Sequence, residues 1–275
     1  MIDELVDAEV PGPVAVLHWN PHRPRFRGRV GRRLPLTAPV GNFGDLLGPE
    51  IVRRMRLLHG GADAAAEPEG SRLLSVGSIL HFARDGDVVW GSGVNGRIPL
   101  DEYERVRLDV RAVRGPRTAA FLAERGAVVP SVFGDPALLV PRLMPELAPG
   151  PAATRDDYVI VPNLHDHAAV ARDRRTIDPR SPWRQVVARI AGARAVFASS
   201  LHGLVIAEAF GVPAVRIAAG LEQDLKYEDY ALGSGDDLLP VFPDLPTALG
   251  HAVRGRRTFA PDLDRLMEAF PHDLW

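Results

Sequence analysis

Cysteine is absent from this chain of 275 residues. Its absence excludes disulfide bonds, thiolate nucleophiles and zinc sites built on cysteine, and it is typical of proteins in a reducing compartment. Lysine is nearly absent too, since Lys226 is the single lysine among 33 basic residues and the others are arginine. Two interpretations of this bias stay open. Genomic base composition produces it, and so does recognition of phosphate or carboxylate by the planar guanidinium group.

Long apolar runs and an excess of one charge are also missing. No stretch approaches the roughly 18 apolar residues that a membrane-spanning helix requires. The amino-terminal stretch MIDELVDAEVPGPVAVLHW is acidic and contains no apolar signal core. The formal net charge is −2, without a basic block or an acidic tail, so nucleic acid is not an expected partner. We therefore expect a cytoplasmic protein without a transmembrane segment.

Short apolar runs alternate with segments of helical periodicity along the chain. The apolar runs predict strands at residues 14–19, 72–78, 87–93, 106–115, 158–162, 193–198 and 213–217. The periodic segments predict helices at residues 42–58, 116–126, 181–192, 203–210, 244–253 and 261–270, and an Arg/Pro-rich stretch at 20–40 predicts a long loop. Ser181 is expected to cap the third of these helices, with Pro182 as its first residue. This alternation predicts parallel sheets with right-handed crossovers, and therefore an α/β fold.

The chain is expected to divide near its middle. Residues 141–156 (PRLMPELAPGPAATRD) contain four prolines and no periodicity, which indicates a linker. The length also exceeds the usual size of a single hydrophobic core. We therefore predict two α/β domains, residues 1–145 and 155–275, that face a central cleft, with the last helix packing back on the first domain.

The stretch SSLHG joins a predicted buried strand to a predicted helix. The backbone amides at a helix start form a site for phosphate or carboxylate, to which Ser199, Ser200, Leu201 and Gly203 would contribute. His202 lies within this turn and can donate or accept a proton near neutral pH. The alternative interpretation is structural: one of the serines caps the helix and the imidazole packs in the core.

The stretch VRGPRT has the same position at the end of another strand. It places Arg114 at the strand end and Arg117 in the first turn of a helix. A cation is unfavourable near a helix amino terminus unless an anion compensates it. A bound anion held by Arg114, with Arg117 in support, would provide that compensation. Two solvated arginines are the alternative.

Four more polar clusters follow predicted strands or precede a helix, and ligands of open parallel sheets bind beyond the carboxyl ends of the strands. Their residues are expected on the acceptor side or elsewhere in the cleft: Asn42, Gly44 and Asp45 in NFGD, Gly91, Ser92 and Gly93 in WGSG, Asp135 in FGDPALL and His165 in VPNLHDH. Asp45 can alternatively serve as a helix cap, and WGSG as a tight turn. The two histidines of HDH alternate along the chain, and residues so placed seldom chelate together, so no metal site is expected.

Taken in order, the stretches NFGDLLGPEIV, VVWGSGV, VRGPRTAAFL, FGDPALLVP, SSLHGLVIAEAFGVPAVRI and KYEDY span about residues 41 to 230. This ordered set resembles the polysaccharide pyruvyl transferase family. The resemblance implies two Rossmann-like domains in a GT-B-like arrangement, with the acceptor on the amino-terminal side and the donor on the carboxyl-terminal side. It implies that phosphoenolpyruvate is the donor and that no other cofactor takes part. The acceptor would be a sugar hydroxyl pair of a glycan or a glycolipid precursor in polysaccharide or exopolysaccharide biosynthesis, and a lipid-linked acceptor would bring the protein to a membrane surface.

The resemblance also implies roles for individual residues. The histidine of the S-x-L-H-G stretch, His202, and the arginine of the turn after the strand, Arg114, are expected to be catalytic and to serve the donor. Formation of the ketal requires a proton at the methylene carbon of the enol, attack by a hydroxyl on the cationic carbon and loss of phosphate, and these residue types suit that chemistry. Some members carry arginine just before the Leu-His pair, where this chain has Ser200. The phosphate contacts here are therefore expected from backbone amides or from another arginine.

Two other functions stay open on the sequence alone. The first is a glycosyltransferase of the same architecture that uses a nucleotide sugar. The second is a catalytically inactive member of the family that binds a sugar, an alternative that the Ser200 departure supports.

Overall fold

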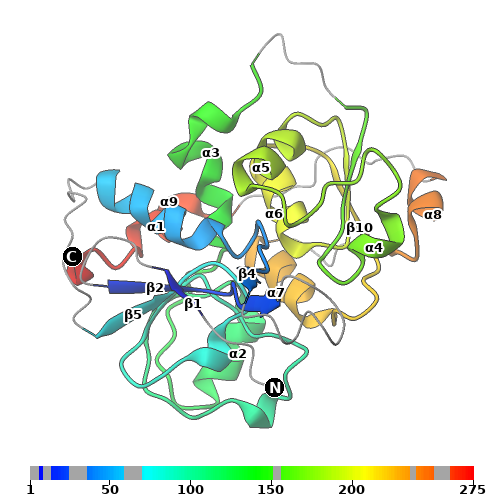
Figure 1. The fold of residues 1–275 in the computed structure, drawn as a ribbon. Helices are drawn as coiled ribbons and strands as arrows, with labels where there is room; N and C mark the ends of the chain where they lie inside the picture. The colour runs from blue at the N-terminus through cyan, green and yellow to red at the C-terminus, as the bar shows by residue number, and fades with distance from the viewer. Residues whose placement is uncertain are drawn as a thin grey trace.

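The structure is a computed structural model that describes residues 6–8, 14–24, 36–58, 70–150, 156–235, 240–250 and 261–275. Two separate sheets with flanking helices make up most of these residues (Figure 1). The first sheet has the order β1-β2-β5-β6-β7, and the second has the order β11-β10-β9-β8. The α/β fold with parallel sheets is therefore confirmed.

The first sheet is parallel except at one edge. Its strands are β1 (Val6–Ala8), β2 (Val14–His18), β5 (Ser71–Leu74), β6 (Val88–Trp90) and β7 (Asp109–Ala112), and only β1 pairs in the antiparallel direction, with β2. The second sheet contains β8 (Val159–Val161), β9 (Val196–Ala198), β10 (Ala214–Ile217) and β11 (Val241–Phe242), all parallel. The residues of β6, β8 and β9 are all buried, as expected for parallel strands covered on both faces.

Helices connect the strands and cover the sheets. The α-helices are α1 (Leu47–Leu58), α2 (Pro116–Ala123), α3 (Val140–Leu143), α4 (His167–Val170), α5 (Trp183–Ala191), α6 (Leu201–Ala209), α7 (Leu225–Gly233), α8 (Leu245–Gly250) and α9 (Leu263–Glu268). Short 3₁₀ helices are η2 (Leu80–Phe82), η3 (Leu100–Glu102), η4 (Pro136–Leu139), η5 (Pro145–Leu147) and η6 (His272–Leu274). Among the helices described, none is long and apolar enough to cross a membrane.

Three local predictions are wrong. Residues 20–40 are not entirely loop, because β3 (His22–Pro24) and β4 (Thr37–Pro39) form a two-stranded antiparallel sheet. These strands have three residues each and are largely exposed, so no hydrophobic alternation marks them. Helix α5 begins at Trp183, and Pro182 has an extended backbone (φ −49°, ψ 125°) at the N-cap position, so Ser181 is not the cap.

The third correction concerns the predicted linker. Its first residues form α3 and η5, in which Pro141 and Pro145 lie at the first turns, where a missing amide hydrogen is tolerated. Leu143 and Met144 are buried in the main core cluster. Residues 151–155 of the same stretch lie outside the described residues. The domain boundaries at 145 and 155 therefore stay a prediction.

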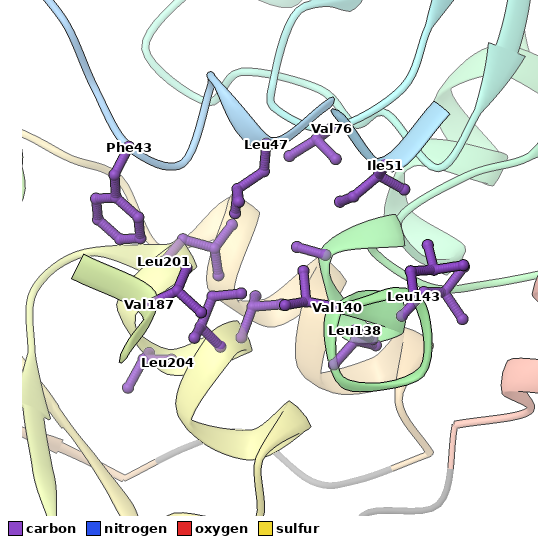
Figure 2. Packing of buried hydrophobic residues seen from close by; sticks show 14 of the residues in the cluster. Phe43, Leu47, Ile51, Val76, Leu138, Val140, Leu143, Val187, Leu201 and Leu204 are labelled. Carbon is purple, nitrogen blue, oxygen red and sulfur yellow. The ribbon is translucent and has the colours of Figure 1, made fainter. Parts of the chain in front are cut away.

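One hydrophobic cluster joins the two sheets. Figure 2 shows Phe43, in the turn before α1, and Leu47, the first residue of α1, on the side of Leu201 of α6, with Val140 in the same cluster. The cluster also reaches the last helix segment. Trp90 of β6 donates a hydrogen bond from its indole nitrogen to the carbonyl of Leu266 in α9 (2.9 Å). The core thus holds the carboxyl end of β9 close to the amino-terminal end of α1, and polar residues next to these two ends line one cavity.

Candidate active site

A cavity of about 290 Å³ is lined by residues from both halves of the chain. Six of the residues that the sequence analysis selected lie on its wall: Asn42, Asp45, His165, Ser200, Leu201 and His202. The other lining residues are Trp19, Ser78, Ile79, His81, Asn95, Arg97, Ile98, Asn163, Leu164, Glu222 and Lys226. Polar and titratable side chains predominate, as expected for a site that binds a polar ligand.

Helix α6 starts at the cavity. Ser200 follows strand β9 and is the N-cap, with an extended backbone and a hydroxyl that accepts a hydrogen bond from the Gly203 amide (3.3 Å). The first amides of a helix have no partner inside the helix, and Ser200, Leu201 and His202 all line the cavity. The start of α6 can therefore bind an anion through backbone amides, and the helix dipole favours negative charge at the same place.

His202 lies in the first turn of α6, with 8% of its surface exposed. Its Nε2 atom is 3.7 Å from Oδ2 of Asp135, beyond hydrogen-bonding distance. Nε2 is buried and has no hydrogen-bond partner among the described residues. The Phe43 ring lies edge-on to the imidazole, with the ring centroids 6.5 Å apart. A buried nitrogen without a partner at a cavity wall is a group that a ligand can satisfy.

Gly44 leaves the space that the imidazole occupies. A Cβ atom at position 44 would lie 2.1 Å from Nδ1 of His202, far inside van der Waals contact. The glycine of NFGD is therefore required on steric grounds, and it acts through His202 rather than through a ligand. Asp135, on the other side of the imidazole, caps η4 by accepting a hydrogen bond from the Ala137 amide (2.9 Å).

Asp45 is a partly buried carboxylate of the cavity. Burial raises the pKa of its carboxyl, and the nearby His202, the hydrogen bond from Asn42 and the Lys226 ammonium oppose this effect only in part. Asn42 donates to Oδ2 of Asp45 at 2.6 Å. Asp45 lies in the turn before α1 rather than inside the helix. A carboxylate with a raised pKa is a stronger base than a solvated one.

Three charged residues of the cavity wall, Arg97, Glu222 and Lys226, were not among the site residues predicted from the sequence. Nζ of Lys226 lies 2.8 Å from Oε2 of Glu222, and Nη1 of Arg97 lies 3.9 Å from Oε1 of the same carboxylate. Arg97 also lies 2.8 Å from Nε2 of His165 through the same nitrogen. Burial lowers the pKa of Lys226, Glu222 opposes that shift, and the positive charge of Arg114 adds to it.

Arg114 is not on the cavity wall. Its side chain is 1% exposed and forms an ion pair with Asp229 of α7, with Nη2 and Oδ2 3.0 Å apart. Its other contacts are hydrogen bonds from Nη1 to the hydroxyl of Ser78 (2.7 Å) and from Nη2 to the carbonyl of Val94 (2.9 Å). Thr118 donates to Asp229 through both its amide and its hydroxyl. Direct contact between Arg114 and a donor therefore stays a prediction, and its observed link to the cavity runs through Ser78.

The remaining predicted site residues lie behind the wall or away from it. Arg117 is 57% exposed at its side chain and lies 3.8 Å from Glu228. Ser92 donates to the carbonyl of Gly77, and Ser199 accepts from the Asn163 amide. Gly91, Gly93 and Gly203 pack against Pro136, Arg114 and Val161, respectively, at distances that would exclude a Cβ atom. Within the described ranges, no group of three or more His, Asp or Glu side chains could hold a metal ion.

Comparison with known proteins shows to which family the chain belongs. The model of the family described as "Polysaccharide pyruvyl transferase" matches residues 48–219, which is more than half of the sequence. The chain belongs to the polysaccharide pyruvyl transferase family. It is 29% identical over 245 residues to the succinoglycan biosynthesis protein ExoV of Rhizobium meliloti (strain 1021), covering 85% of this chain and 74% of that protein. A crystal structure of a functionally uncharacterized protein from Klebsiella pneumoniae subsp. pneumoniae aligns with a TM-score of 0.45 and 10% identity, over 74% of this chain and 90% of that one.

Family membership confirms the resemblance drawn from the ordered motifs. The matched region of this pyruvyl transferase includes Arg97, His165, Ser200 and His202, and it ends before Lys226. The stretch NFGD, with Asn42 and Asp45, lies just ahead of it. The structure brings the matched and the unmatched parts to the same cavity.

We expect Gly44→Ala to lower turnover by about 10–100-fold, because the new methyl group would push the imidazole of His202 out of place by an ångström or more. Gly48→Ala is the matched control four residues away. Its Cβ atom would lie 3.5 Å from Cβ of Val76, an ordinary contact, so activity and stability should be retained. Steady-state kinetics on both purified variants measures the difference. Equal activity of the two would contradict the steric role of Gly44.

Proposed function

We propose that this pyruvyl transferase moves the pyruvyl group of phosphoenolpyruvate onto two hydroxyls of a sugar as a cyclic ketal. The observation that carries the proposal is the position of His202 in the first turn of α6 on the cavity wall, with a buried Nε2 that has no hydrogen-bond partner among the described residues. A phosphate needs the amides and the dipole, and an enol needs a proton donor next to them. Both requirements are met within one helical turn.

In this proposal, the imidazolium of His202 transfers its proton to the methylene carbon of the bound enol phosphate, which leaves a cationic carbon at C2. A sugar hydroxyl attacks C2 and passes its proton to Asp45, whose raised pKa suits it to accept one. Phosphate then leaves with the electron pair of the C–O bond, and the second hydroxyl attacks C2, closes the ring and passes its proton to the neutral imidazole of His202. The amides of Leu201 and His202 stabilise the departing phosphate. No metal or further cofactor is needed in this sequence.

The placement of Arg114 gives it a positioning role in the same proposal. Its hydrogen bond orients the Ser78 hydroxyl, and Ser78 lines the cavity. Ser200 stands where some members carry arginine, so in this proposal a direct contact between a cationic side chain and the donor comes from another residue of the wall. Arg97 has the geometry for this, because it is 43% exposed at its side chain and lines the cavity.

We further propose that the two sheets are the cores of two Rossmann-like domains in a GT-B-like arrangement, with the acceptor bound on the first and the donor on the second. The acceptor would be an exopolysaccharide precursor, free or lipid-linked, and synthesis would take place in the cytoplasm. The support for this class of acceptor is the similarity to a succinoglycan biosynthesis protein. Trp19 and Asn95 at the wall are residue types that bind sugar rings and hydroxyls.

Ligand-dependent thermal stability tests the proposal. Phosphoenolpyruvate at one hundred times its Kd should stabilise the fold by about 2.7 kcal/mol, which a melting curve resolves. Nucleotide sugars should produce no such shift, because His202 and the α6 amides are proposed to serve an enol phosphate. Stabilisation by nucleotide sugars alone would favour the glycosyltransferase alternative, and stabilisation by glycans alone would favour the inactive sugar-binding alternative.

A further inference from the structure

Three of the four asparagines in the sequence line the cavity: Asn42, Asn95 and Asn163. Two of them use their side-chain amino group within the protein. Nδ2 of Asn42 donates to Oδ2 of Asp45 at 2.6 Å, and Nδ2 of Asn163 donates to Oδ2 of Asp166 at 2.7 Å. Asn95 differs, because its side chain bonds to the protein through its oxygen. Its amino group therefore lies at the wall without an acceptor among the described residues.

The carboxamide of Asn95 is oriented by its own turn. The backbone amide of Arg97 donates to Oδ1 of Asn95 at 3.1 Å. A backbone amide can only donate, so the oxygen of the carboxamide must face it and the amino group must lie on the other side. Asn95 is half-buried, and its Nδ2 carries two hydrogens that a ligand of the cavity can bind.

Tyr103 holds the backbone of Asn95 from behind the wall. Its hydroxyl accepts a hydrogen bond from the Asn95 amide at 2.8 Å and donates one to the Asn95 carbonyl at 3.1 Å. Tyr103 is 6% exposed, and its ring lies edge-on to Phe121, with the centroids 4.9 Å apart. Burial raises the pKa of Tyr103 to about 12, so the hydroxyl keeps the proton that it donates. The position of Asn95 is therefore set before a ligand arrives, which lowers the entropic cost of binding.

The surroundings of Asn95 suit a sugar better than an anion. Asn95 lies between β6 and β7, in the half of the chain that holds the first sheet, whereas the anion-binding amides of α6 belong to the other half. Trp19 and Ile98 line the cavity from the same half, and their apolar surfaces can pack against the CH groups of a pyranose. A neutral amide donates to a hydroxyl oxygen without adding a charge that would hold the anionic donor instead.

We propose that Asn95 determines specificity for the acceptor, with Nδ2 donating a hydrogen bond to a hydroxyl oxygen of the acceptor sugar, and that Tyr103 is its positioning residue. This inference rests on the proposed function and extends it to the contacts of the acceptor. Such a bond selects the pair of hydroxyls that meets the reacting carbon, because a sugar turned in the cavity would lose it. A sugar without that oxygen leaves the amino group unpaired, which is a basis for discrimination between analogues.

The side-chain NMR signals of asparagine test the contact directly. Protein labelled with ¹⁵N at asparagine Nδ2, with a tag free of asparagine, contains four such groups, and Asn95→Ser identifies the signal of Asn95 by its absence. The probes are methyl β-D-glucopyranoside and methyl β-D-galactopyranoside, which both carry hydroxyl pairs able to close a ketal ring and differ in configuration at C4. Each is added with and without phosphoenolpyruvate. At least one glycoside should shift the Asn95 signal as it binds.

Variants separate acceptor binding from donor binding. Asn95→Ser should weaken binding of that glycoside by about 3–10-fold, as loss of one hydrogen bond does, and leave phosphoenolpyruvate affinity close to that of the wild type. Serine is chosen because its hydroxyl can accept from the Arg97 amide and keep the turn. Tyr103→Phe keeps the ring but loses both bonds to Asn95, and should weaken the glycoside by about 2–5-fold. Tyr158→Phe is the matched control, since that ring packs on Phe197 away from the cavity wall, and it should change neither affinity.

The outcomes are distinct. If a glycoside binds but neither moves the Asn95 signal nor loses affinity in Asn95→Ser, the inference is wrong and the proposed function stands. A loss of phosphoenolpyruvate affinity alone in Asn95→Ser would place the amide on the donor, which also overturns it. Failure of both glycosides to bind the wild type overturns it together with the acceptor site. If Asn95→Ser does not fold, the signal that Tyr103→Phe displaces and the glycoside affinity of Tyr103→Phe decide. A glycoside that shifts the Asn95 signal in a protein that does not bind phosphoenolpyruvate would uphold the contact and overturn the proposed function.

Discussion

His202→Gln is expected to lower turnover by about 100-fold or more, as loss of a general acid usually does, while the melting temperature stays close to that of the wild type. Glutamine keeps a side-chain donor and acceptor of similar reach, but it cannot carry a proton near neutral pH. In the wild type, Nε2 of His202 has no hydrogen-bond partner among the described residues, so the substitution breaks no hydrogen bond made by that atom. The expected loss is therefore chemical rather than structural.

The packing alternative predicts the opposite result. If His202 served mainly to fill space against Phe43 and Gly44, the variant would melt at a lower temperature and each folded molecule would keep its turnover. His167→Gln is the matched control, because that half-buried histidine lies outside the cavity wall, 4.0 Å from Asp178. It should change neither quantity. Turnover and melting temperature measured on the same preparations decide, and a stable, fully active His202→Gln would end the catalytic interpretation.

The sequence predicted the central elements because they bury apolar side chains in regular patterns. Leu47, Ile51 and Met55 at helical spacing gave α1, and the uninterrupted apolar runs before NLH and SSLHG gave β8 and β9. The hairpin of β3 and β4 was missed because strands of three exposed residues leave no such pattern. The end of the first half was taken as a linker because prolines at the starts of short helices look like an aperiodic stretch.

The sequence could predict only those site residues that lie near the carboxyl ends of predicted strands. In parallel sheets these ends lie at one edge, and this rule selected His202, Ser200 and Asp45 without any knowledge of their contacts. It could not decide whether Arg114 points to a ligand or to a partner, because that partner, Asp229, is 115 residues away in the sequence. Lys226 follows no strand end directly. The signal that could have found it was its uniqueness in a chain otherwise supplied with arginine.

The buried pair of Arg114 and Asp229 connects the two halves of the chain, since Arg114 follows β7 of the first sheet and Asp229 lies in α7. We expect Asp229→Ala to lower the free energy of unfolding by about 3–5 kcal/mol, because it leaves a buried guanidinium without its counter-charge. Both side chains are at most 1% exposed, so water cannot replace the lost partner. The hydroxyl and the amide of Thr118 lose their acceptors as well.

The neighbouring residue provides the control. Glu228 of α7 pairs with Arg117 of α2 at 3.8 Å, but their side chains are 30% and 57% exposed. Solvent screens this pair, so Glu228→Ala should cost at most about 1 kcal/mol. Chemical denaturation of both variants compares a buried and a more exposed ion pair made by neighbouring residues of α7. Similar small losses would mean that the guanidinium of Arg114 is satisfied without Asp229. A guanidinium that then turned toward the cavity would support the direct donor contact predicted from the sequence.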